Sequence, residues 1–359
     1  MKEIFVIVPA LPPQINGLGD YAAVQARALY KDYGVQTKFI VAGRKKYPSD
    51  KFENFEVISI DQDAGEDSYE KIGSFLNESP DVFHLHYVGY GYEKRGAPLS
   101  LLNFLKRIKR TEPAAKIITT FHELYAGSNK PWTSAFWLRQ MQKKVCRGIY
   151  LLSDEVITVR NGYAKLLKKF KNKNVHVMPV FSNTGEEEFP LQLEKRDRTM
   201  IIFSSANIDY SFSNFTNEII AFCRENKVTK ITTIGNAEIT LTDHSFYIEK
   251  NPFLPADEIS RLMKKAYCCF IGFPFPEWFA KSGVFATACA HGTLPIAIGS
   301  SGNEDGVIGG KNYFDCLQPS DQNSFQQIAD EAYRWYMQHQ ISKNVSLLNE
   351  VYSRSAIAN

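Results

Sequence analysis

The amino-acid sequence predicts the α/β class, with two doubly wound domains in tandem. Short apolar or β-branched runs alternate with helical patterns, and this alternation breaks once, at a polar segment, before it starts again. The chain of 359 residues is also longer than one ordinary hydrophobic core requires. Parallel sheets of this kind bind ligands at the carboxyl ends of their strands. We therefore expect two Rossmann-like domains that face a cleft.

The first half of the chain contains seven strand candidates with helical patterns between them. Each candidate is a nearly continuous apolar or β-branched run, as parallel strands covered on both faces require. The first helix has Tyr21, Val24, Ala28 and Leu29 on one face and stops at Gly34. The strand candidates are residues 4–8, 35–41, 57–60, 82–86, 117–121, 156–159 and 175–177.

A polar segment at residues 184–198 separates the first domain, residues 1–183, from the second, residues 199–335. The chain then ends in an amphipathic helical pattern, from about Ser324 to Tyr352. The strand candidates of the second domain are residues 201–204, 231–234, 268–273 and 294–298.

The charge of the two halves differs in sign. Residues 1–180 hold 27 Lys and Arg against 18 Asp and Glu, whereas residues 181–359 hold 15 against 21. Either the basic clusters hold the first domain to an anionic membrane that carries a lipid-linked acceptor, or they are solvated helix faces. Nucleic acid is not expected as a partner, because aromatic residues are not interleaved with these charges in the sequence. The clusters are residues 106–110, 143–147 and 165–173.

The sequence predicts a cytoplasmic protein, either free or peripheral at the inner membrane face. It has no run of about 18 or more apolar residues that would form a transmembrane helix. The N-terminus enters a strand pattern directly, without the features of a signal peptide. The six cysteines show no paired spacing, so we expect reduced thiols and no metal site.

The loop after the first strand contains three prolines and then Gly17, Gly19 and Asp20 at a helix start. Gly17, Gly19 and Ala22 match the dinucleotide pattern G-x-G-x-x-A. In that fold, however, the first glycine follows the strand almost at once, and here eight residues intervene. We therefore interpret the loop as a place of close backbone approach by a ligand that spans the cleft.

Two other loops follow strands and carry histidines. By strand alternation His84 and His86 share one face, so we expect at most His86, which is nearer the strand end, to face the cleft, whereas a core position explains His84 at least as well. After the next strand, His122 and Glu123 form a pair suited to acid–base chemistry or to holding a sugar hydroxyl.

The stretch from Phe279 to Pro295 predicts an anion site. Lys281, Ser282 and Gly283 would open a helix of small residues, and free N–H groups, the helix dipole and the ammonium group would favour a phosphate there. The alternative is an ordinary crossover with a solvated lysine.

Three segments resemble the GT-B glycosyltransferases, in particular the family-4-like group. The resemblance extends in order over nearly the whole chain, and its motifs are moderately specific. It implies an acceptor on the N-terminal domain, a nucleotide-sugar on the C-terminal domain and a last helix, residues 336–359, that crosses back. The segments are Pro-x-x-Pro with Asn16-Gly17-Leu-Gly19-Asp20-Tyr21, then Thr120-Phe-His122-Glu123, and Lys281-Ser282-Gly283 with His291-Gly292-x-x-Pro295.

The resemblance implies roles for these residues in sugar transfer. Because the basic pair that usually grips the diphosphate in this family is missing here, we infer that Lys281, Ser282 and the helix start at Gly283 bind it instead, with Gly17 and Gly19 on its other side. His122 would contact the transferred sugar, Glu277 its hydroxyls, and Asp20 would orient the acceptor or act as base. The donor side would also include Glu123 and Asn207, and the acceptor side His86 and Tyr87. No cofactor or metal is expected.

The sequence departs from the family at two places. Thr287 stands where the second of two glutamates usually lies, and the first would fall near Phe279, with Glu277 as the closest acid. The basic pair after the first strand of the second domain is also missing. The resemblance implies retention of the anomeric configuration, which the missing glutamate leaves open. A catalytically silent subunit that binds a partner transferase and a sugar-nucleotide epimerase therefore remain as alternatives.

Overall fold

The structure, a computed structural model, divides into two compact units. Unit 1 comprises Met1–Met178 with Ile341–Asn359, and unit 2 comprises Pro179–Gln340. Each is described by itself. The structure describes residues 3–14, 16–60, 81–126, 132, 134–203, 206–236, 239, 245–272, 276–298, 304–318 and 322–356.

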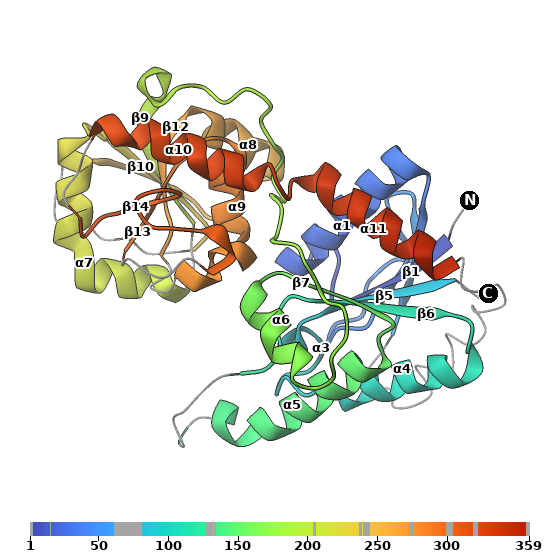
Figure 1. Ribbon diagram of the computed structural model, residues 1–359. Coiled ribbons are helices and arrows are strands. Elements are labelled where there is room, and N and C mark those ends of the chain that lie inside the picture. Colours follow the sequence, from blue (N-terminus) through green and yellow to red (C-terminus); the bar gives the residue numbers. More distant parts are fainter. Residues whose placement is uncertain are drawn as a thin grey trace. The chain divides into compact units, whose positions relative to one another are not determined.

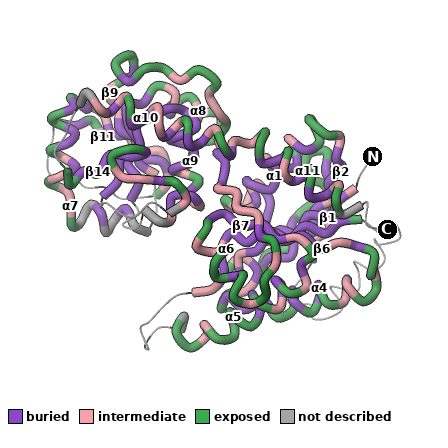
Figure 2. The backbone as a smooth tube through the Cα atoms, viewed as in Figure 1, coloured by how far each residue is buried: buried purple, intermediate pink, exposed green. Residues whose placement is uncertain are grey.

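Unit 1 contains a sheet in the order β3-β4-β2-β1-β5-β6-β7-β8, in which only the β3–β4 pair is antiparallel (Figure 1). The near-continuous apolar runs become its central strands, which are buried (Figure 2). The strands are β1 (Glu3–Val8), β2 (Gln36–Val41), β3 (Lys51–Phe52), β4 (Phe55–Ser59), β5 (Val82–Tyr87), β6 (Lys116–Phe121), β7 (Glu155–Thr158) and β8 (His176–Val177).

Helices cover both faces of this sheet. The first core lies under α4 (Leu99–Thr111), α5 (Ser134–Leu152) and α6 (Asn161–Lys168). The second lies under α1 (Gly17–Tyr33) and α11 (Ile341–Ala356). A short helix, α3 (Gly89–Tyr92), follows β5. The alternation along β5 sends Phe83, Leu85 and Tyr87 into the first core, and His84 and His86 to the opposite side.

Helix α11 is tied to α1 by buried polar contacts. Gln25 Nε2 donates to Asn344 Oδ1 at 2.6 Å, and Asn344 Nδ2 donates to Tyr21 Oη at 3.0 Å. Helix α1 itself begins at the cap Asn16 and ends at Gly34, which has a φ of 65°. The last helix of the chain therefore belongs to the same unit as the first.

Unit 2 contains a parallel sheet in the order β11-β10-β9-β12-β13-β14. Its strands are β9 (Asp197–Phe203), β10 (Lys230–Ile234), β11 (Tyr247–Asn251), β12 (Ala266–Phe270), β13 (Leu294–Ala297) and β14 (Phe314–Asp315). Its helices are α7 (Ala206–Glu225), α8 (Ala256–Lys265), α9 (Gly283–Ala290) and α10 (Gln322–Tyr336), with 3₁₀ turns η2 (Leu193–Lys195), η3 (Pro276–Lys281) and η4 (Glu304–Gly306). The expected α/β class, with parallel sheets and covering helices, is confirmed for both units.

The structure differs from the expected organisation at the boundaries. Residues 179–183 were expected in the first domain but form hydrogen bonds within unit 2. Val180 N donates to Ala280 O at 2.9 Å, and Ser182 N donates to Tyr336 Oη at 2.9 Å.

The expected linker, residues 184–198, also belongs to unit 2. Near its end, the buried Arg196 donates to the carbonyls of Leu191, Met263, Ala266 and His291. The helical pattern from about Ser324 to Tyr352 is divided into α10 in unit 2 and α11 in unit 1, and α11 lies within residues 336–359, where the last helix was expected.

Candidate functional site

The loop between β1 and α1 is held by its own residues. Asn16 Oδ1 accepts from the backbone N–H groups of Leu18 at 3.0 Å and Gly19 at 3.1 Å. A Cβ at Gly19 would lie 2.4 Å from Ala10 O, whereas at Gly17 it would meet nothing within 4 Å. Gly19 is therefore required by the packing of the loop on its helix, and only Gly17 leaves open space for a ligand.

His86 and His122 form a buried pair at the carboxyl edge of the sheet. Parallel pairing sets His86 opposite Thr120, so His122 follows at the end of the adjacent strand. The Nδ1 of His86 and the Nε2 of His122 are 3.1 Å apart, and the rings stack with centroids 5.3 Å apart. Tyr21 presents its ring edge-on to both imidazoles. In this hydrogen bond one imidazole nitrogen must be protonated and donate, and the other must be unprotonated and accept. The contact therefore fits two neutral imidazole rings.

Burial sets the protonation of this pair. It lowers the pKa of His86 to about 3 and that of His122 well below its usual value, and His86 lowers the latter further. Both rings are therefore neutral near pH 7. Within the described part of the chain, His86 Nε2 is buried without a hydrogen-bond partner, and His122 is 8% exposed.

His84, in contrast, is satisfied in the core. Its Nδ1 lies 2.7 Å from Tyr352 Oη and its Nε2 lies 2.8 Å from Thr120 Oγ1. Burial lowers its pKa well below the usual value. The expectation of a core histidine here agrees with these contacts.

The expectation for Tyr87 is wrong. Its side chain is fully buried in the first core, edge-on to Phe121. Because β5 alternates, a tyrosine next to His86 must face the other side of the sheet and cannot line an acceptor surface there.

Two carboxylates of the predicted site also belong to unit 1. Glu123 is half-buried, and its N–H approaches Tyr87 O at 3.5 Å. Asp20 lies half-buried in the first turn of α1. Burial raises its pKa, and Arg27 partly offsets that shift.

Gln142, which belongs to none of the sequence motifs, organises the neighbouring loops. It is fully buried in α5. Its Oε1 accepts from Ala126 N at 2.8 Å, and its Nε2 donates to Tyr90 Oη at 2.9 Å and to Arg95 O at 2.7 Å. One side chain therefore ties the loop after β6 to the loop after β5. These contacts are long-range, and no local pattern signals them.

In unit 2, α9 begins at Gly283, two residues after Lys281, where the helix was expected to open. Lys281 ends η3, with its ammonium 5.0 Å from the centre of the Trp278 ring, and Ser282 is the helix cap. Ser282 Oγ accepts from Phe285 N at 3.2 Å. The N–H groups of Gly283 and Val284 have no partner inside the helix. Gly283 is exposed, whereas α9 is buried from Phe285 onward. A buried helix thus opens to solvent at its positive end.

Hydroxyl groups surround the position where the resembled family has its second glutamate. Thr287 Oγ1 lies 3.2 Å from both Ser182 Oγ and Thr184 Oγ1. A carboxylate that the sequence analysis did not select, Glu186, accepts from Tyr336 Oη at 2.5 Å. Phe279, near the expected place of the first glutamate, is buried and stacks on Phe285.

For two expected site residues the structure describes the backbone alone. The side chains of Glu277 and Asn207 are not among the described ones. Across the described residues, no three His, Cys, Asp or Glu side chains are grouped so as to hold a metal ion.

Comparison with known proteins identifies the fold. No protein-family model matches the chain, and no curated protein sequence matches it. Many solved structures align with the chain, and among those that do so over nearly its whole length are three of different description. An alpha-glucosyltransferase in complex with UDP and a 13-mer DNA has a TM-score of 0.61 and 13% identity, with 98% of each chain covered. HepE of Anabaena in complex with UDP-glucose has a TM-score of 0.63 and 12% identity, covering 99% of this chain and 100% of that one.

The third structure is a putative UDP-N-acetylglucosamine 2-epimerase from Listeria monocytogenes, with a TM-score of 0.63 and 11% identity. The alignment covers 98% of that chain and 100% of this one. The chain therefore has the GT-B fold of two Rossmann-like domains. The narrower resemblance to the family-4-like group stays a prediction.

Proposed function

We propose that this protein is a glycosyltransferase that moves a sugar from a nucleotide-diphosphate donor to a hydroxyl acceptor. The observation that carries the proposal is the open N-terminus of α9, which follows β12 in a chain of GT-B fold. Structures of the same fold hold UDP or UDP-glucose. An exposed helix start with an adjacent lysine suits the diphosphate of such a donor.

The helix start would stabilise the leaving group. As the bond to the anomeric carbon breaks, negative charge develops on the diphosphate. The N–H groups of Gly283 and Val284 and the Lys281 ammonium would meet this charge, and Ser282 would keep the helix start in place. In this proposal the stabilisation needs no metal ion. Retention of the anomeric configuration remains part of the proposal, although Thr287 offers no carboxylate.

Unit 1 would supply the polar groups for the sugar and the acceptor. His122, neutral and slightly exposed, can donate or accept a hydrogen bond without adding charge. Asp20, whose pKa is raised by burial, is the candidate to orient or deprotonate the acceptor. Gly17 would admit close backbone approach.

A panel of nucleotides tests this proposal by calorimetry. UDP, GDP, ADP, CMP and their sugars are titrated into the protein, into Lys281→Ala and into the control Lys265→Ala, an exposed lysine of the same unit. We expect one nucleotide-sugar to bind and its affinity to fall by about tenfold or more in Lys281→Ala only, the loss of one charge-assisted contact. Equal affinities in all three proteins would contradict the assignment.

A second candidate is favoured by a specific observation. One structure of this fold is a putative epimerase, and Thr287 and Phe279 stand where the resembled family has glutamates. Incubation of the bound donor without acceptor distinguishes the possibilities. An epimerase converts the sugar, a transferase needs an added hydroxyl acceptor for rapid turnover, and a silent subunit binds the donor and does neither.

A further inference from the structure

Helix α5 presents apolar and basic side chains together on its exposed side. We define the α5 face as seven residues spaced mainly three or four apart, on the side opposite the buried Val145, Cys146 and Ile149. Its apolar members are large: Trp137 is 73% exposed, Met141 46% and Leu151 42%. The members of the α5 face are Trp137, Gln140, Met141, Lys143, Lys144, Arg147 and Leu151.

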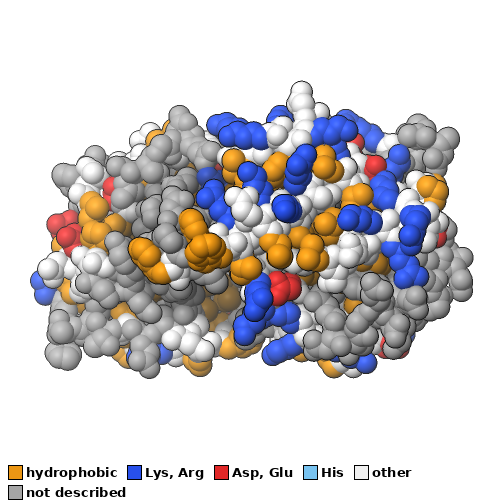
Figure 3. Space-filling view, turned by 90° about the horizontal axis from the view of Figure 1, so that it is seen from below, with side chains coloured by type: hydrophobic (Ala, Val, Ile, Leu, Met, Phe, Trp, Pro, Cys, Tyr) orange, Lys and Arg blue, Asp and Glu red, His pale blue; other side chains and the backbone are white. Residues whose placement is uncertain are grey.

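The layer that contains this face is basic throughout. The helices α4, α5 and α6 all pack on the first core and together contain no Asp or Glu. They hold ten Lys and Arg residues, four each in α4 and α5 and two in α6. Figure 3 shows Lys and Arg side chains spread over this side of the molecule, with hydrophobic side chains between them.

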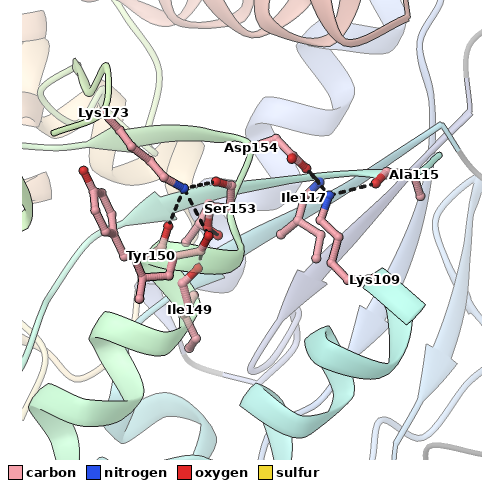
Figure 4. Close-up of polar contacts among 10 residues, drawn as sticks. Lys109, Ala115, Ile117, Ile149, Tyr150, Ser153, Asp154 and Lys173 are labelled. Carbon is pink, nitrogen blue, oxygen red and sulfur yellow. Dashed lines mark hydrogen bonds and ion pairs between the residues drawn. The ribbon is translucent and has the colours of Figure 1, made fainter. Parts of the chain in front are cut away.

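Two neighbouring lysines, in contrast to those of the α5 face, bind other groups within unit 1. Lys173 Nζ donates to the carbonyls of Tyr150, Leu151 and Ser153 at 3.1, 3.1 and 2.7 Å, which caps the end of α5 (Figure 4). Lys109 Nζ pairs with Asp154 at 2.5 Å. Among the residues that the structure covers, Lys143, Lys144 and Arg147 meet no carboxylate, so their charge is available to a partner.

We propose that the α5 face docks unit 1 on an anionic lipid bilayer. Cations beside exposed Trp, Met and Leu are the composition that binds at a membrane interface, where the apolar groups enter the headgroup boundary and the cations meet anionic lipids. No described helix has both the length and the apolar composition to cross a membrane, so this contact is peripheral. It does not depend on the proposed transfer activity.

Lipid fits this face better than nucleic acid does. The sequence order separates the aromatic residues from the charges, but the helix brings Trp137 and Phe136, 37% exposed, to the side of Lys143 and Lys144. A stacking platform for bases would use these aromatic rings. Base stacking does not involve the exposed side chains of Met141 and Leu151, whereas insertion into a bilayer buries such apolar groups.

Docking would also orient the candidate site. Helix α5 follows β6, so its first turns lie toward the carboxyl edge of the sheet, where His122 lies. Trp137 is in those first turns, and the basic residues come after it. The aromatic end of the face would therefore hold the edge of the sheet that carries His122 beside the bilayer.

The test is flotation of the full chain with vesicles. We compare phosphatidylcholine vesicles with vesicles that also contain phosphatidylglycerol, at low and high salt. The variants are Lys143→Glu/Lys144→Glu, Trp137→Ala/Met141→Ala and the control Lys250→Glu/Lys265→Glu, which makes the same change in charge on unit 2. Circular dichroism establishes that each variant is folded.

We expect salt-sensitive binding to the anionic vesicles only. Since each cation near an anionic surface contributes a factor of roughly five, Lys143→Glu/Lys144→Glu should weaken binding at least about 25-fold, while the control binds like the parent protein. Trp137→Ala/Met141→Ala should weaken binding at both salt concentrations. Equal binding by Lys143→Glu/Lys144→Glu and the control, no vesicle binding at low salt, or binding of duplex DNA instead of vesicles would each overturn the proposal. None of these results depends on donor binding.

Discussion

Acidification should destabilise unit 1 through the buried histidine pair. Burial lowers the pKa of His86 to about 3, against about 6.5 in the unfolded chain. Between these two pH values the unfolded state binds a proton that the folded state does not bind. The contribution of His86 to the free energy of unfolding is therefore fully present above about pH 6.5 and is lost as the pH falls. From pH 8 to pH 5 the loss from His86 alone comes to about 2 kcal/mol.

The variant His86→Gln isolates this contribution. Hydrogen exchange of the β5 amides at pH 8 and pH 5 gives the opening free energy of unit 1 in each protein, after correction for the intrinsic exchange rate. The parent should lose about 2 kcal/mol more than the variant on acidification. Equal losses in the two proteins, or a His86 imidazole that titrates near pH 6.5 by NMR, would refute the reasoning.

Three further substitutions test the packing that positions the site. Gly19→Ala should destabilise unit 1 by about 1–3 kcal/mol, because its Cβ would meet a backbone carbonyl at 2.4 Å, whereas Gly17→Ala should cost less than about 1 kcal/mol in urea unfolding. Asn344→Leu should cost about 1–3 kcal/mol, since it removes two buried hydrogen bonds between α11 and α1, and unchanged exchange of the α11 amides would contradict this. Lys173→Met should increase exchange in the last turn of α5, which it caps, while β5 keeps its protection.

Much of the fold could be predicted because parallel strands buried on both faces appear as apolar runs. The strands that were not expected lack that signal. β11 contains Glu249 and Lys250, and β3 and β14 have two residues each. Such segments become strands by pairing with a neighbour, which is a long-range effect.

The candidate site was predictable where a residue's position along an element decides its role. Ser282 before a run of small residues indicated a helix start, and strand alternation placed His84 and His86 on one face of their strand. The same alternation, applied to Tyr87, would have sent it to the core. The contact of His86 with His122 required the order of the strands, which the sequence does not contain. The contacts of Gln142 required the positions of two separate loops.

The most direct test of the central proposal is an NMR titration of the amide-labelled protein with the nucleotide-sugar selected by calorimetry. The account predicts that the amide signals of Gly283 and Val284 shift on binding, that Lys265→Ala shows the same shifts, and that Lys281→Ala needs about tenfold more ligand or more to reach them. Tight donor binding that leaves the Gly283 and Val284 signals in place would contradict the account.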